Sequence, residues 1–154
     1  MEEYLKRIAE SLERAFPLDP DSDFFEKADA FIWEPAQNQF SEVNDISTVD
    51  ISLLKGMDEE IDQVRLNTEA FIEGKLANNV LVWGARGMGK STLVKSVVKV
   101  ANSKSKSLKI IEVTRDDIGQ VDQLLKLIKN INKKFIIFCD DISFDDNETS
   151  YKSL

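Results

Sequence analysis

The chain has 154 residues, 42% of them hydrophobic, and a formal net charge of −8. This length fits one ordinary domain with a buried core, and the composition argues against wholesale disorder. There is no histidine and only one cysteine, Cys139, which excludes Ser-His or Cys-His catalysis and an intrachain disulfide.

The charge is unevenly distributed along the chain. Residues 1–60 carry 16 acidic and 5 basic side chains, whereas residues 61–154 carry 12 and 15. An acidic front half is expected to be repelled by nucleic acid and by anionic lipid. The N-terminal residues alternate in charge instead of forming a signal peptide, and no apolar run approaches transmembrane length. We therefore expect a cytoplasmic protein without membrane or nucleic-acid partners.

Residues 1–50 are predicted to form an N-terminal accessory segment. An amphipathic helix is expected from Glu3 to Phe16, followed by an acidic linker from Pro17 to Asp23. The segments 31–33 and 39–43 flank a turn-like stretch at 35–38 and predict a small hairpin. Packing of this segment against the core is the favoured interpretation, and partner binding stays open as the alternative.

A second amphipathic helix is predicted from Asp58 to Glu73. Gly74 follows it and is a good signal for a helix C-terminus. We expect this helix to pack on the edge of a sheet through Ile61, Val64, Phe71 and Ile72.

Residues 84–91 read Gly-Ala-Arg-Gly-Met-Gly-Lys-Ser, a complete phosphate-binding loop motif. Its glycines permit left-handed backbone, so that successive N–H groups can point at phosphate oxygens. Lys90 supplies a charge for the β- and γ-phosphates, and the Ser91 hydroxyl can ligate Mg²⁺. The residues expected to contact the phosphates are Gly84, Ala85, Arg86, Gly87, Met88, Gly89, Lys90, Ser91 and Thr92.

The sequence around this loop favours a phosphate site over a turn that binds nothing. Asn79–Trp83 is predicted to be a short buried strand, and 92–100 has the apolar period of a helix. The helix would place its positive end beneath the anion.

Two further strands are predicted, at 108–114 and 135–139. A helical turn is expected at 114–117 and an amphipathic helix at 121–131 between them. The pattern over residues 79–139 is β-α-β-α-β, which predicts an α/β fold with a doubly wound parallel sheet and right-handed crossovers.

Two carboxylates, Asp140 and Asp141, follow the apolar run at 135–139. Ligands of open α/β sheets bind at the carboxyl ends of strands, so Asp140 is the expected Mg²⁺ partner. Asp141 is a candidate to orient or deprotonate an attacking water, and with Lys90 it forms the candidate catalytic pair. The alternative is that both aspartates only cap a turn. Cys139 is interpreted as a buried structural thiol.

These segments resemble an uncharacterised bacterial family of predicted ATP-binding proteins in the AAA+ superfamily. The resemblance rests on 77–91 around the loop, on 138–144 and 151–154 as the Walker B segment and its continuation, and on 53–58 as an entry motif. It implies ATP and Mg²⁺ as cofactors and a three-layer P-loop core with sheet order 5-1-4-3-2. Residues 51–154 would be the N-terminal half of the ATP-binding domain. Gly56 and Met57 would run beside the adenine.

Two departures from that family alter the expectation for this chain. AAA+ ATPases usually have glutamate where Asp141 stands, and the shorter side chain is expected to slow hydrolysis. The strand that inserts between 79–83 and 135–139 in AAA+ proteins is absent, as are the sensor, the arginine finger and the helical lid. We expect a truncated product in which those two strands either leave a gap or pair directly. Such a chain would bind nucleotide weakly and not turn it over.

Three function classes therefore stay open. The first is an ATPase whose full-length form works as a homo-oligomer on an unidentified protein partner. The second is a nucleotide-binding or scaffold fragment without catalysis. The third is another P-loop class, a kinase or GTPase. A GTPase is disfavoured because 132–135 lacks the aspartate that reads guanine, and a small-molecule kinase because no basic lid or acceptor site is visible.

Overall fold

The computed structural model describes residues 1–15, 20–105 and 107–142. The helices are α1 (Glu2–Ala15), α2 (Asp58–Ile72), α3 (Lys90–Ser105) and α4 (Val121–Ile128). The strands are β1 (Ala30–Glu34), β2 (Gln39–Val43), β3 (Leu108–Val113) and β4 (Lys134–Cys139). Three 3₁₀ turns complete the described elements, η1 (Phe24–Glu26), η2 (Ile51–Leu53) and η3 (Arg115–Gln120). Phe16, the start of the acidic linker, and the segments 143–144 and 151–154 lie outside the described residues.

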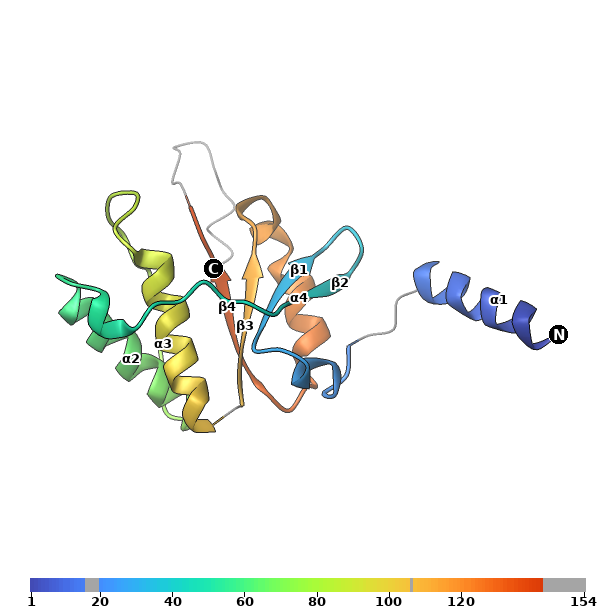
Figure 1. Ribbon diagram of the computed structural model, residues 1–154, viewed down its shortest axis with the longest axis horizontal. Helices are drawn as coiled ribbons and strands as arrows, with labels where there is room; N and C mark the ends of the chain where they lie inside the picture. The colour runs from blue at the N-terminus through green and yellow to red at the C-terminus, as the bar shows by residue number, and fades with distance from the viewer. Residues whose placement is uncertain (16–19, 106, 143–154) are drawn as a thin grey trace.

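The four strands form one open sheet in the order β2-β1-β3-β4 (Figure 1). The predicted hairpin is confirmed, since β1 and β2 pair antiparallel around a turn at 35–38. β1 and β3 are parallel, as are β3 and β4. The hairpin therefore belongs to the same sheet as the two later strands, and the predicted α/β class with a mostly parallel sheet is confirmed.

Helices cover both faces of this sheet, so the core lies in two layers (Figure 1). On one face Phe25 of η1 is fully buried and meets Phe31 and Phe135 edge-on, with ring centroids 4.9 Å apart in both cases. On the other face α3 packs through Val98 and Ala101 against Ala30, Leu108 and Ile110. Successive side chains of each strand point to opposite faces of the sheet, so every strand contributes residues to both layers of the core.

The strand predicted at Asn79–Trp83 does not form, and that prediction was wrong. Val80, Leu81 and Trp83 are 50, 61 and 86% exposed. An apolar run becomes a strand only where a neighbour shares its backbone hydrogen bonds, and the described sheet ends at β4 instead. Among the described residues neither the sheet order 5-1-4-3-2 nor direct pairing of 79–83 with β4 is present.

The position of β4 corrects a second expectation. All six of its residues are half-buried, although the apolar run predicted burial on both faces. β4 pairs with β3 and is the last strand of the described sheet, so one side of it lacks the neighbour that would complete its burial.

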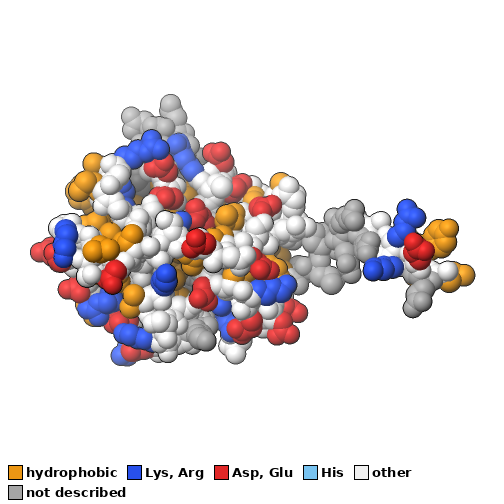
Figure 2. Space-filling view, viewed as in Figure 1, with side chains coloured by type: hydrophobic (Ala, Val, Ile, Leu, Met, Phe, Trp, Pro, Cys, Tyr) orange, Lys and Arg blue, Asp and Glu red, His pale blue; other side chains and the backbone are white. Residues whose placement is uncertain are grey.

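Helix α1 stands away from the rest of the chain (Figure 1). Its apolar stripe is more than half exposed, as the hydrophobic side chains at the far end of Figure 2 show, and consists of Tyr4, Leu5, Ile8 and Leu12. The predicted packing of this helix on the core was therefore wrong, although the hairpin that follows does pack. No helix in the described ranges is both long and apolar enough to cross a membrane.

Helix α2 and the strap at 44–50 complete the face of the sheet that α3 covers. Gly74 follows α2 with a φ of +72°, which confirms the predicted helix end. The strap joins the hairpin to η2 and is fixed on α3. Val49 N donates to Ser96 Oγ at 3.1 Å, and Lys99 Nζ donates to Thr48 Oγ1 at 2.9 Å.

Candidate functional site

The loop at 84–91 has the backbone conformation that its glycines predict. Gly84, Gly87 and Gly89 have φ angles of +145°, +79° and +85°, which are rarely open to residues with a Cβ. Helix α3 begins at Lys90, and Leu93 N donates to Gly89 O at 2.8 Å. The curled backbone therefore leads directly into a helix N-terminus, where N–H groups lack intrahelical partners.

The Lys90 side chain folds back over this loop. Its Nζ donates to Gly84 O at 3.0 Å and to Ala85 O at 2.9 Å. The ammonium group is thus held beside the loop backbone by two carbonyl groups rather than by a carboxylate. A phosphate oxygen could replace either carbonyl as an acceptor, because an ammonium group presents three donors.

The two aspartates after β4 lie on the loop side of the molecule. Arg86 Nη2 and Asp141 Oδ2 are 4.0 Å apart, and both side chains are highly exposed. Such a pair adds little stability, but it shows that the loop and the end of β4 are neighbours. Asp141 has a φ of +57°, and its N–H donates to Asp140 Oδ1 at 2.9 Å.

The segment 51–57 packs against the same loop. A Cβ added to Gly89 would lie 3.6 Å from Leu54 Cδ2 and 3.9 Å from Met57 Sδ, which is ordinary van der Waals contact. Met57 is buried in a cluster with Leu93 of α3, whereas Gly56 is exposed with a φ of +74°. The residues expected beside the adenine are therefore next to the loop.

The available oxygen ligands fit a magnesium ion. Ser91 and Asp140 offer a hydroxyl and a carboxylate, the hard ligands that Mg²⁺ takes from proteins. Within the described ranges no group of three or more His, Cys, Asp or Glu side chains could hold a metal.

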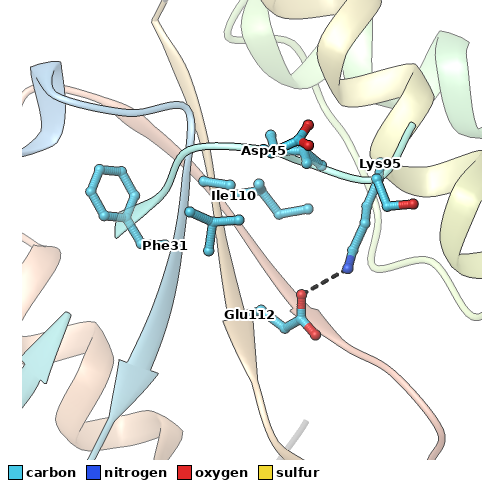
Figure 3. Close-up of a pocket in the computed structure, with 9 residues that line it drawn as sticks. Phe31, Asp45, Lys95, Ile110 and Glu112 are labelled. Carbon is cyan, nitrogen blue, oxygen red and sulfur yellow. Dashed lines mark hydrogen bonds and ion pairs between the residues drawn. The ribbon is translucent and has the colours of Figure 1, made fainter. Parts of the chain in front are cut away.

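Lys95 of α3 is paired with Glu112 of β3 and is not part of a solvated helix face. Its Nζ lies 2.8 Å from Glu112 Oε2, and its side chain is only 21% exposed. The pair borders a cavity of about 160 Å³ between the sheet and the strap at 44–50 (Figure 3). The sequence carried no signal for this pair, because 17 residues separate its members.

The Cys139 thiol has a pKa above its usual value. Burial is the main cause, and the carboxylates of Asp140 and Glu112 add to it by disfavouring a thiolate. A raised pKa suits the predicted structural role of this thiol and argues against a nucleophile.

A family model matches residues 26–154, from η1 through the loop and the two aspartates. The chain belongs to the DUF815 family. The family is described as proteins of unknown function, and α1 lies before the part that DUF815 covers. No curated protein and no solved structure matches the chain significantly.

Proposed function

We propose that this DUF815 protein binds ATP together with Mg²⁺ at the loop 84–91. One observation carries the proposal, the three glycines with positive φ that lead into the N-terminus of α3. Backbone N–H groups in such a curl, with the helix dipole behind them, form a site for anions. The Lys90 ammonium group beside this loop adds a mobile positive charge.

The proposal assigns a role to five residues at or beside the loop. Lys90 binds the β- and γ-phosphates, and Ser91 and Asp140 hold the magnesium ion. Bound Mg²⁺ would neutralise phosphate charge. Gly56 and Met57 lie beside the loop, where the exposed Gly56 would border the adenine and the buried Met57 side chain supports Gly89.

As the first candidate we propose hydrolysis by an AAA+-like oligomer that acts on a protein partner, with Asp141 as the group that orients water. A binding role without hydrolysis is the second candidate. It is favoured by the segment 79–83, which forms no strand of the described sheet. Asp141 itself faces Arg86 at the surface.

Competition for a fluorescent ATP analogue tests the proposal. With Mg²⁺ present, ATP should displace the analogue at lower concentration than GTP or CTP, and a Lys90→Ala variant should bind it much more weakly. Release of phosphate from bound ATP would support hydrolysis, and binding without release would support the second candidate. Equal binding by wild type and variant would contradict the proposed site, and preference for GTP would favour another P-loop class.

A further inference from the structure

Lys95 links three elements near the proposed site, helix α3 and the strands β3 and β4. It projects from α3 and pairs with Glu112 of β3 at 2.8 Å. The same Nζ lies 5.4 Å from the ring centroid of Phe138 in β4. Glu112 and Phe138 are direct partners in the β3–β4 register, so one ammonium group contacts two neighbouring strands at one level of the sheet.

The position of this contact follows the geometry of a helix and a strand. Ser91 precedes Lys95 by four residues and shares its helix face, a little more than one turn or about 6 Å away along the helix axis. Asp140 follows Phe138 by two residues and comes directly after the last residue of β4, about 6.6 Å further along the chain. Lys95 therefore links the helix that carries Ser91 to the strand that precedes Asp140. Its contacts lie about one helical turn from Ser91 and two residues from Asp140.

We propose that Lys95, held by Glu112, is a positioning residue that sets the spacing between Ser91 and Asp140 for Mg²⁺. The inference rests on the proposed function. The contact is shielded, since Lys95 is 21% and Glu112 37% exposed, so it is screened less than a pair on the open surface. Figure 3 shows both side chains pointing toward each other from α3 and β3 across the end of the cavity.

Binding of a fluorescent ATP analogue, measured with Mg²⁺ and with EDTA, tests this role. Lys95→Met should lower the ratio of the two affinities about tenfold, as loss of a residue that orients metal ligands does. Its affinity in EDTA should stay within about twofold of wild type, because the loop itself is unchanged. Lys95→Arg keeps the charge and should restore most of the ratio.

Two further variants separate positioning from a simple charge effect. Glu112→Gln should lower the ratio in the same direction as Lys95→Met, whereas a mere field effect would shift the two in opposite directions. Lys99→Met, one turn further along α3 and bonded to Thr48, is the matched control and should leave the ratio unchanged.

An unchanged ratio in folded Lys95→Met, or opposite shifts in Lys95→Met and Glu112→Gln, would overturn the inference while leaving nucleotide binding intact. Failure of the wild-type protein to bind the analogue under either condition would overturn the proposed function and this inference together.

Discussion

Replacing Lys90 with methionine tests whether its ammonium group binds the nucleotide phosphates at the loop. Methionine keeps an unbranched apolar chain but removes the ammonium group. Among the described residues that group donates to the carbonyls of Gly84 and Ala85, at 3.0 and 2.9 Å. Both bonds lie in an exposed loop, so we expect the free energy of unfolding to fall by less than about 1 kcal/mol.

The effect on nucleotide affinity should be much larger. A hydrogen bond to a charged group contributes about 1.5–3 kcal/mol, which corresponds to a loss of about 10- to 150-fold in affinity. Calorimetric titration of MgATP into wild type and Lys90→Met measures it, with Lys99→Met as a control for the loss of one positive charge on α3. Affinities for Lys90→Met and wild type within about twofold would refute the role assigned to Lys90.

Three other predictions concern the fold. Phe25→Ala removes a fully buried ring and should cost about 3–5 kcal/mol in urea unfolding, and a loss below about 1 kcal/mol would contradict the described core. Gly74→Ala places a Cβ at a φ of +72° and should lower the free energy of unfolding by about 1 kcal/mol. Gly119→Ala, at ordinary φ, is the control and should be near neutral. Equal effects of the two variants would argue against a helix end at Gly74. The Glu26 pKa lies below its usual 4.5, mainly through its hydrogen bond with Lys133, so its stabilising contribution is present above about pH 4.5 and is lost as the pH falls through the lowered pKa. Glu26→Gln should therefore unfold with a weaker acid dependence than wild type in this range, and an identical dependence would contradict the pairing.

Local signals in the sequence predicted most of the fold. The hairpin, β3, β4 and the end of α2 at Gly74 all follow from apolar period and turn residues, and each is present. The segment 79–83 shows where such signals fail. Its residues have the composition of a strand, but strand formation depends on a neighbour distant in sequence, and the described sheet ends at β4 without it.

The candidate site divides in the same way. The glycine conformations at 84–89 were predictable, because the required backbone is closed to most other residues. The proximity of Met57 to Gly89 came only from the family resemblance. The contact of Lys95 with Glu112 and Phe138 was not predictable, since it depends on the β3–β4 register and on where α3 crosses the sheet.

Amide hydrogen exchange with and without saturating MgATP tests the central claim most directly. Because the proposal assigns phosphate binding to the backbone N–H groups of 84–91, these amides should exchange more slowly when MgATP is bound. Residues 30–43 of the hairpin should be unaffected. Binding of MgATP with unchanged exchange across 84–91, or protection confined to another part of the chain, would contradict the account.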